Sequence, residues 1–323
     1  MLKRLLANKW SVLSLIRTPL IFVARYYKTF HQIRNLIAQL DFEKIDRTQI
    51  LKTRVIRKLS DDPINYVDIG ARGGLLEFLK PFESVLNTIF FEPDTEEFLK
   101  MQKLHADKRV QIFNVAVSDS DSTKTLYLTK KRGGSSLLHP SGHMIGLMAQ
   151  DGVGIDRFAV EKTIEIKTQR LDEVVNFSEI KIDILKIDTQ GSEYEILGAL
   201  GGHRPFLICA ECATTEIYKN QKSIFATGLL LENLGYFPLH MMDGHLIPKT
   251  AATWRNSTQL YGDVIFVPDN SENGIAIIKR DVEKWFAALC MHGYVDFALW
   301  QISELKIPKP ELILQTEELL KNN

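Results

Sequence analysis

The sequence has few cysteines, no net charge and no long uninterrupted apolar run. Three cysteines among 323 residues are too few for a disulfide framework. Cys209 and Cys212 have two residues between them, but no second pair is present to complete a zinc site. We therefore interpret them as small core residues of a reduced, cytoplasmic protein. The 40 basic and 40 acidic residues cancel, so the overall charge does not favour nucleic acid as a partner.

Acidic residues are absent before Asp41, whereas basic residues and apolar residues at helical spacing are frequent there. We predict that residues 1–60 form a basic helical extension, which Pro19 splits into two helices. Arg17 and Arg25 interrupt the longest apolar stretch, so neither a bilayer-spanning helix nor a secretory signal is expected. The favoured role is packing on its own domain or on a partner subunit of an oligomer. The alternative is weak peripheral contact with the inner face of an anionic membrane.

Three short segments share one pattern, in which an apolar run ends in an acidic residue and a turn. They read YVDIGARGG at residues 66–74, FFEPD at 90–94 and LKIDTQGSEYE at 185–195. In doubly wound α/β sheets, cofactors bind at the carboxyl ends of parallel strands, where such turns begin. The pattern predicts a doubly wound, mostly parallel Rossmann-like sheet over residues 61–270. Residues 271–323 are predicted to form a C-terminal helical extension.

Apolar periodicity places the individual elements. Expected strands cover residues 66–69, 88–91, 110–117, 183–187, 206–210, 237–241 and 263–267, and expected helices cover residues 75–82, 95–105, 223–234 and segments that begin at residues 192 and 281. After residue 117 the alternation of strands and helices stops until residue 183. Strand-like pieces at 125–129 and 163–168 there surround a glycine-rich stretch, residues 133–154, which has the length of a functional lid or of a disordered segment.

The motifs follow an order that can be compared with known families. VDIGA, FFEPD, NVAVSDS and LKIDTQGSEYEIL are followed by an apolar strand that ends in Glu211. This order resembles the FkbM family of S-adenosylmethionine-dependent methyltransferases, and the resemblance covers residues 65–266. It departs from the family pattern at two positions. The family usually has Asn where this chain has Arg72, and Glu where this chain has Gln190 in Asp188-Thr189-Gln190-Gly191.

The resemblance implies that the first turn holds the methionine end of S-adenosylmethionine. Asp68 is expected to accept hydrogen bonds from the cofactor's ammonium group, directly or through water. A glycine turn lets backbone amides approach a bound cofactor, with a helix N-terminus behind it. The residues expected to form this turn are Gly70, Ala71, Gly73 and Gly74.

The resemblance places the ribose and the adenine along the next two strands. Glu92 is expected to hold the two ribose hydroxyls, as an acid does in dinucleotide-binding folds, and Pro93 fixes the turn behind it. Asn114 and Ala116 follow the family pattern where the adenine would lie, and Ala116 would leave room for the ring. Arg72 has two open roles, a solvated loop cation or a partner of the cofactor's carboxylate.

The fourth strand carries the expected catalytic residue. A hydroxyl is a weak nucleophile, so a positioned base such as Asp188 would help to remove its proton during methyl transfer. Glu211, at the end of the neighbouring strand, is expected to share this role or to orient the substrate. Ser135 and Ser136 resemble the family's loop over the active site and are expected to contact cofactor or substrate.

Local signals give the remaining expectations. Ser192 and Glu195 have the spacing of a capping box at a helix start. Glu193 between them is either a lid or substrate residue or an acid favoured by the helix dipole. A metal site is not expected, because Pro140 and Gly142 oppose a helix that could align His139 with His143.

The most direct interpretation is an S-adenosylmethionine-dependent methyltransferase. Its acceptor would be a small molecule or a glycan, methylated on a hydroxyl. One alternative is a non-catalytic protein that binds the cofactor or only a protein partner, an interpretation that Arg72 and Gln190 keep open. A second alternative is a nicotinamide-dependent oxidoreductase. Arg72 argues against it, because this residue occupies the place of a glycine in the dinucleotide-binding motif.

Overall fold

The computed structural model of the protein describes residues 59–105, 109–142, 154–176, 178–241, 244–246, 258–308 and 313–314. The chain divides into two units, Met1–Ile50 and Leu51–Asn323, and the described residues all belong to the second. The basic N-terminal segment lies outside the described residues, so both interpretations of it stay predictions. No helix among the described residues is long and apolar enough to cross a membrane.

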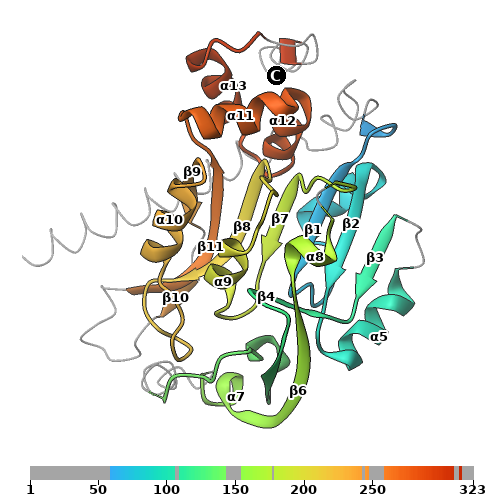
Figure 1. Ribbon diagram of the computed structural model, residues 1–323, viewed down its shortest axis with the longest axis vertical. Helices are drawn as coiled ribbons and strands as arrows, with labels where there is room; N and C mark the ends of the chain where they lie inside the picture. The colour runs from blue at the N-terminus through green and yellow to red at the C-terminus, as the bar shows by residue number, and fades with distance from the viewer. Residues whose placement is uncertain are drawn as a thin grey trace, which may run out of the picture. The chain divides into compact units, whose positions relative to one another are not determined.

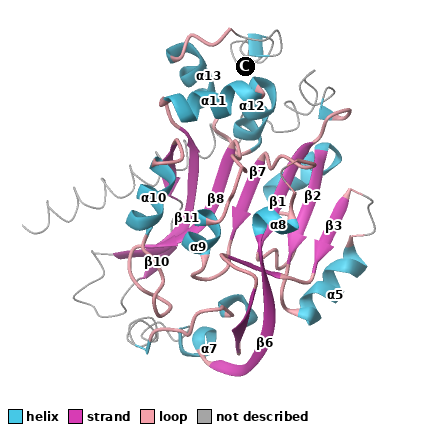
Figure 2. Ribbon diagram, viewed as in Figure 1, coloured by secondary structure: helices cyan, strands magenta, loops and turns pink. Residues whose placement is uncertain are grey.

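A large sheet with a parallel centre organises the described part of the chain (Figures 1 and 2). Its strand order is β10-β11-β8-β7-β1-β2-β3, and β9 pairs with β11. The parallel strands are β1 (Ile64–Ile69), β2 (Leu86–Phe91), β3 (Val110–Phe113), β7 (Ile184–Ile187) and β8 (Leu207–Ala213). The antiparallel strands are β9 (Tyr236–Met241), β10 (Gly244–Leu246) and β11 (Thr258–Pro268). This is the doubly wound, mostly parallel fold that the sequence predicts.

The central strands are buried on both faces, which explains why they read as nearly continuous apolar runs. From β1 the chain proceeds to β2 and β3 on one side, and later to β7 and β8 on the other. The strand order therefore reverses between β1 and β7. In doubly wound sheets this reversal opens a crevice at the carboxyl ends of the strands.

A second sheet follows β3 and has the order β4-β6-β5. Its strands are β4 (Ala116–Ser118), β5 (Ser122–Thr129) and β6 (Val160–Arg170), and Figure 1 shows it beyond the carboxyl ends of the parallel strands. The strand-like pieces at 125–129 and 163–168 are thus confirmed. The single strand expected over residues 110–117 is wrong. The chain leaves the large sheet at Asn114, whose side-chain amide donates instead to the carbonyl oxygens of Glu92 (2.9 Å) and Pro93 (3.1 Å).

Helices connect the strands and cover the sheet. They are η1 (Glu77–Val85), α5 (Thr95–Leu104), η2 (Arg132–Gly134), α7 (Gly154–Phe158), α8 (Leu171–Val174), α9 (Glu193–Gly198), α10 (Ile224–Glu232), α11 (Glu272–Arg280), α12 (Val282–Met291) and α13 (Val295–Glu304). The helix expected over residues 75–82 is the 3-10 helix η1, which begins two residues later and has Pro81 inside it. Proline lacks the amide donor of a continuous α-helix. A regular helix N-terminus therefore does not stand behind the glycine turn.

The C-terminal helices lie at the opposite end of the large sheet from the second sheet (Figure 1). Asp281 caps α12 by accepting hydrogen bonds from the amides of Glu283 (3.1 Å) and Lys284 (3.0 Å). Trp285 and Phe286 are fully buried, as their helical periodicity predicts. These helices add to the core without approaching the ends of the strands where the sheet order reverses.

The first prediction concerns the turn after β1. Gly70 and Gly73 both have φ +83°, but a Cβ atom on Gly70 would lie 2.0 Å from the carbonyl oxygen of Asp188, whereas one on Gly73 would meet nothing within 4 Å. Gly73→Ala should therefore lower the free energy of unfolding by about 1 kcal/mol, the cost of the left-handed backbone. Gly70→Ala should lower it by at least about 2 kcal/mol more, because β1 and β7 must separate.

Urea denaturation of the two variants measures this difference. Gly73→Ala is the matched control, since it carries the same backbone cost without the clash. Equal losses of stability in both variants would show that the two strand ends do not need this close approach.

Candidate active site

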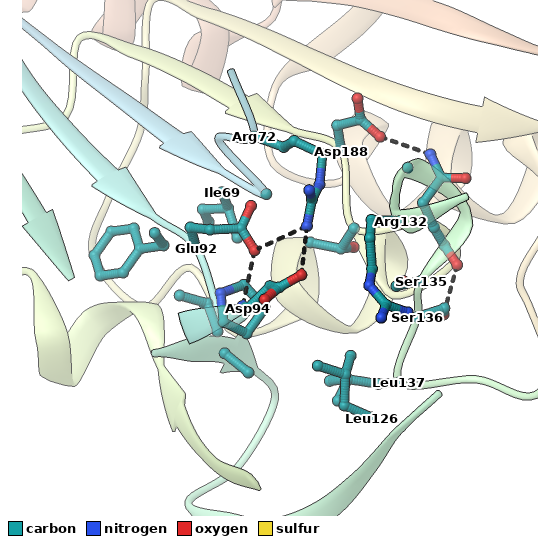
Figure 3. Close-up of a pocket in the computed structure, with 18 of the residues that line it drawn as sticks. Ile69, Arg72, Glu92, Asp94, Leu126, Arg132, Ser135, Ser136, Leu137 and Asp188 are labelled. Atoms are coloured by element: carbon teal, nitrogen blue, oxygen red, sulfur yellow. Dashed lines mark hydrogen bonds and ion pairs between the residues drawn. The ribbon is translucent and has the colours of Figure 1, made fainter. Parts of the chain in front are cut away.

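A cavity lies between the carboxyl ends of β1, β2 and β7 and the second sheet (Figure 3). Its walls come from the turns after these strands, from β4 and β5, and from the loop that begins at η2. The lining residues are Ile69, Gly70, Arg72, Phe91, Glu92, Pro93, Asp94, Val115, Ala116, Val117, Leu126, Leu128, Arg132, Gly133, Ser135, Ser136, Leu137, Asp188, Thr189 and Gln190. The cavity therefore lies where the order of parallel strands reverses, the usual ligand site of such folds.

The cavity has an apolar wall and a charged wall. Ala116 and Val117 of β4 and Leu126 and Leu128 of β5 form much of the apolar wall. The charged wall contains Arg72, Glu92, Asp94 and Asp188. Such a site can hold a ligand that has a flat apolar part at one end and polar groups at the other.

Glu92 follows β2 and is 4% exposed. Its Oε1 accepts a hydrogen bond from the amide of Asp94 at 2.8 Å. Burial raises the pKa of Glu92 to about 7, although that hydrogen bond and the charge of Arg72 oppose the rise. The carboxyl group therefore changes its charge near neutral pH, at the wall of the cavity.

Arg72 joins the acids around Glu92 (Figure 3). Its Nη2 atom lies 2.9 Å from Asp94 Oδ2 and 3.9 Å from Glu92 Oε1, and its Nη1 atom lies 3.2 Å from Glu97 Oε2. The guanidinium group is thus a partner of three carboxylates from the β2–α5 turn and the first turn of α5. It lines the cavity, so contact with a bound cofactor stays a prediction.

Asp68 does not line the cavity and is 1% exposed. Its Oδ1 accepts a hydrogen bond from Lys186 Nζ at 3.2 Å, and its Oδ2 accepts one from the hydroxyl of Tyr66, also at 3.2 Å. The expected direct contact with a cofactor ammonium group does not fit this arrangement, because both oxygens face buried partners. Sequence analysis missed Lys186, although a lysine inside the apolar run ILKI is itself a signal of a buried ion pair.

The glycine turn also differs from expectation. The amides of Gly70 and Ala71 both donate to the carbonyl oxygen of Phe91, at 2.9 and 3.1 Å, and the amide of Gly74 donates to Ala71 at 2.8 Å. These amides are therefore not directed at a ligand. Of the four turn residues, Gly70 lines the cavity, whereas Ala71, Gly73 and Gly74 do not. The turn serves the approach of β1 to β7.

Two of the expected cofactor residues lie in the turn after β2 and at the start of β4. Pro93 and Ala116 both line the cavity. Asn114 does not line it, because its side chain is occupied by the carbonyl groups of Glu92 and Pro93 and by the hydroxyl of Thr95 at 3.0 Å. Asn114 therefore fixes the turn that carries Glu92, and this contact differs from the adenine contact expected for it.

Asp188 and Glu211, the two expected catalytic acids, are held together by Gln190. The Nε2 atom of Gln190 donates to Asp188 Oδ1 at 2.8 Å and also to Glu211 Oε2. Asp188 lines the cavity and its side chain is 36% exposed, whereas Glu211 does not line it. Burial, followed by the charge of Asp188, raises the pKa of Glu211 to about 9. Only Asp188 is therefore placed to meet a ligand in this cavity.

Glu193 shapes the turn after β7 and is 3% exposed. It accepts hydrogen bonds from the amide and hydroxyl of Thr189, both at 2.9 Å, and from the amide of Gly191 at 2.9 Å. The capping box expected from Ser192 and Glu195 is wrong, since Ser192 makes no side-chain cap bond. Gly191 has φ +122°, and this tight turn directs the free amides to Glu193 instead. Glu193 does not line the cavity.

Ser135 and Ser136 both line the cavity. Ser136 Oγ donates to the carbonyl oxygen of Gln190 at 2.7 Å, and Ser135 Oγ accepts from the amide of Thr129 at 3.1 Å. The loop is thus attached to the turn after β7, and its contact with cofactor or substrate stays a prediction. Arg132, which sequence analysis missed, also lines the cavity and pairs with Glu161 at 3.0 Å.

Metal-binding residues do not gather at this site. No group of three or more His, Cys, Asp or Glu side chains in the described part of the chain could hold a metal ion. The ring of His139 contacts the carbonyl oxygen of Pro140 at 2.8 Å, and His143 lies outside the described residues. Cys209 and Cys212 are free and buried, as expected of core residues.

Residues 68–238 match the family model described as the methyltransferase FkbM domain, which is more than half of the 323 residues. The chain belongs to the FkbM methyltransferase family. The resemblance seen in the motifs is thereby confirmed. A search of curated proteins gave no match.

Two solved methyltransferase structures show distant similarity. Precorrin-6y C5,15-methyltransferase from Geobacter metallireducens GS-15 is 11% identical, with a TM-score of 0.31, over 66% of this chain and 86% of that protein. The 1,6-didemethyltoxoflavin-N1-methyltransferase from Burkholderia thailandensis, solved with 1,6-didemethyltoxoflavin and S-adenosylhomocysteine, is 10% identical, with a TM-score of 0.29, over 79% and 90%. The strand order of the large sheet, rather than these similarities, identifies the fold of the present chain.

The two departures from the FkbM pattern both have structural partners. Arg72 pairs with acids of the β2–α5 turn, and Gln190 joins Asp188 to Glu211. Neither side chain projects into solvent without contacts. Both change the charge balance next to the acids that line or flank the cavity.

The second prediction tests the buried charge pair behind Asp188. Lys186→Met should lower the free energy of unfolding by about 3 kcal/mol, because it leaves the Asp68 carboxyl group buried without its cation. The double variant Lys186→Met/Asp68→Asn should recover most of this loss, since neither buried charge remains. Urea denaturation of the wild type and both variants measures the effect. A double variant no more stable than the single variant would contradict the pairing.

Proposed function

We propose that this methyltransferase uses S-adenosylmethionine and methylates a hydroxyl group of a glycan or another polar metabolite. The observation that carries the proposal is the cavity at the strand-order reversal, with Glu92 and Asp188 on its charged wall. Family membership supports methyl transfer in general. The cofactor and the acceptor class are our inference from the residues that line this cavity. We also retain, as proposals, a cytoplasmic location and at most weak membrane contact through the N-terminal segment.

The lining residues fit the parts of S-adenosylmethionine. Ala116, Val117, Leu126 and Leu128 offer an apolar wall for the flat adenine ring. Glu92, at the carboxyl end of β2, has the place at which an acid holds ribose hydroxyls in related sheets. The methionine carboxylate would find a cation in Arg72 or Arg132, both of which line the cavity.

The chemistry then needs one proton acceptor. The cofactor, when bound, supplies an electrophilic methyl group. Asp188 would accept the proton of the acceptor hydroxyl, since its side chain is partly exposed to the cavity and is oriented by Gln190. Lys186 Nζ lies 3.7 Å from Asp188 Oδ2, so a cation lies next to the carboxyl group that would accept the proton. Alignment of the two reactants by the cavity walls would provide most of the remaining rate increase.

The third prediction concerns the charge of Glu92. Its pKa of about 7 means that the ionised form, which can accept hydrogen bonds from both ribose hydroxyls, is lost as the pH falls through 7. The affinity for S-adenosylhomocysteine should therefore rise about tenfold from pH 6 to pH 8. In Glu92→Gln this pH dependence should disappear, and at pH 8 binding should weaken by about 1.5–3 kcal/mol.

Titration calorimetry at pH 6, 7 and 8 measures both effects. Glu97→Gln is the matched control, because Glu97 also pairs with Arg72 but does not line the cavity. Burial raises the pKa of Glu193 to about 7 as well, so the comparison between variants is needed to assign the change. An unchanged pH dependence in Glu92→Gln would remove Glu92 from the ribose site. Parallel titrations with S-adenosylmethionine and NAD separate the proposed cofactor from that of the nicotinamide alternative.

The fourth prediction concerns the base. Asp188→Asn should reduce methyl transfer by about 10²–10⁴-fold, because an amide of the same size cannot accept the proton. Affinity for S-adenosylhomocysteine and the melting temperature should stay close to wild type. Glu211→Gln should reduce turnover less, since Glu211 does not line the cavity.

Turnover is followed as transfer of a labelled methyl group to a panel of glycans and polar hydroxyl compounds. Melting temperature and cofactor affinity are measured on the same samples. A folded Asp188→Asn protein that binds cofactor and turns over normally would exclude Asp188 as the base. A variant that loses stability and cofactor binding together would assign Asp188 a structural role in the turn.

A further inference from the structure

Gln190 connects four parts of the active site. Its side-chain Nε2 donates to Asp188 and Glu211, and its Oε1 accepts from the hydroxyl of Tyr218 at 2.9 Å. Its backbone carbonyl accepts from Ser136 Oγ at 2.7 Å. The residue is 8% exposed, so these partners replace water at nearly every polar atom that it has.

The side-chain amide of Gln190 has as many donors and acceptors as its neighbours can pair with. A glutamine amide has two N–H donors, and each is directed at a different carboxylate. Its oxygen faces the Tyr218 hydroxyl, which also lies 3.0 Å from the carbonyl oxygen of Gly134. A carboxylate at position 190 could not make the first two contacts, because it has no donor.

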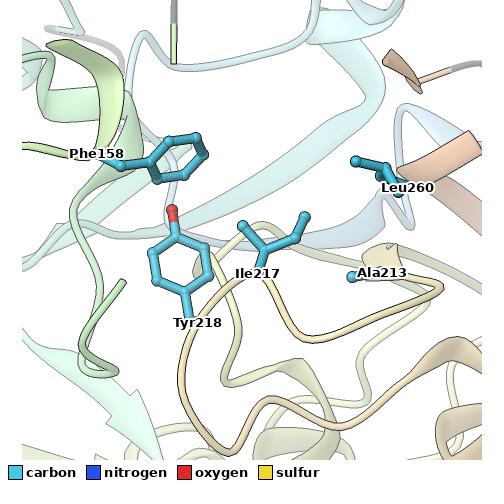
Figure 4. Close-up of a cluster of buried hydrophobic side chains, with 5 residues drawn as sticks. All are labelled: Phe158, Ala213, Ile217, Tyr218 and Leu260. Atoms are coloured by element: carbon cyan, nitrogen blue, oxygen red, sulfur yellow. The ribbon is translucent and has the colours of Figure 1, made fainter. Parts of the chain in front are cut away.

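Gln190 also separates two spaces. Asp188 lines the main cavity, whereas Glu211 lines a small second cavity with Arg157, Tyr218 and Tyr261, and Gln190 lines both. Phe158, Ile217 and Tyr218, which belong to one apolar cluster (Figure 4), also line this second cavity. The side chain of Gln190 is therefore the wall between Glu211 and the proposed cofactor space.

The charges around this wall come from several elements. Lys186 of β7 lies 3.7 Å from Asp188, and Asp68 of β1 lies behind it at 3.2 Å from Lys186. Arg157 of α7, Glu193 of α9 and Asp263 of β11 act on the charge state of Glu211. An additional carboxylate at position 190 would join a group already rich in acids.

We propose that Gln190 is a positioning residue of the methyl-transfer centre, which holds Asp188 at the wall of the main cavity and keeps Glu211 out of it. This inference rests on the proposed function. Asp188 would then be the one carboxyl group of the pair that lines the cavity proposed for the cofactor. Tyr218 and Ser136 fix the amide and the backbone of Gln190, so the loops that carry them take part in this positioning.

The backbone at position 190 allows a discriminating variant. Gln190 has φ +61°, a left-handed conformation that asparagine adopts more readily than glutamine. Gln190→Asn therefore suits the backbone at this position, whereas its side chain, one methylene shorter, cannot reach both acids. Gln190→Glu keeps the length but exchanges the donors for a negative charge.

The test compares S-adenosylmethionine with S-adenosylhomocysteine by titration calorimetry. The first has a positive sulfonium and the second a neutral thioether, so the ratio of their affinities reports the charge near the sulfur. Gln190→Glu should increase this ratio in favour of S-adenosylmethionine by about three- to tenfold, because it adds a carboxylate. Gln190→Asn should decrease it at least about threefold, because Asp188 is no longer held at the wall.

Gln301→Asn is the matched control, since Gln301 is a fully buried glutamine of α13 that bonds to Pro268 at 2.8 Å, outside the cavity. It should leave the ratio unchanged even if stability falls. A wild-type ratio in Gln190→Asn, or an equal loss of both affinities with a lower melting temperature, overturns the proposal and assigns Gln190 a structural role. A wild-type protein that binds neither compound overturns the proposed function as well. The first two outcomes leave that function intact.

Discussion

The close approach of β1 to β7 positions the whole candidate site. The Asp188 carbonyl oxygen occupies the space that a Cβ atom of residue 70 would need, and the Asp188 amide donates to Ile69 at 2.9 Å. Two residues before Asp188, Lys186 lies opposite Asp68 in the parallel register and forms an ion pair with it. These contacts hold the end of β7 against the turn after β1. Asp188 is therefore the first residue after a strand that is fixed at its end, which suits a residue that must meet a reacting atom.

Carboxyl groups accumulate at these strand ends, and each has a partner that limits their mutual repulsion. Asp68 has Lys186, Glu92 has the nearby Arg72, and Glu211 has the amide of Gln190. Burial nevertheless raises the pKa of Glu92 to about 7 and that of Glu211 to about 9. Two of the three partners, Arg72 and Gln190, are the positions at which the chain departs from the FkbM pattern. Their contacts indicate that the departures belong to the charge balance of this particular site.

The errors of sequence analysis have a common physical origin. The predicted strand over residues 110–117 breaks because the Asn114 side chain bonds to the turn after β2, and the expected capping box fails because Glu193 collects the free amides. The helix expected over residues 75–82 forms as the 3-10 helix η1, which contains Pro81. In each case a side-chain contact or a missing donor outweighs the apolar period, which reports burial but not local hydrogen bonding.

Apolar runs and turn residues were sufficient to determine the central strands, the strand ends where a ligand would lie and the family. Buried strands and glycine turns leave strong local patterns, so they can be read without knowledge of neighbours. The tertiary structure alone decided which acids face the cavity. Asp68 turns to Lys186, which is 118 residues away in the chain, and Glu211 lies behind Gln190. The partner of a buried carboxyl group depends on residues that only folding brings close, and no local pattern records that choice.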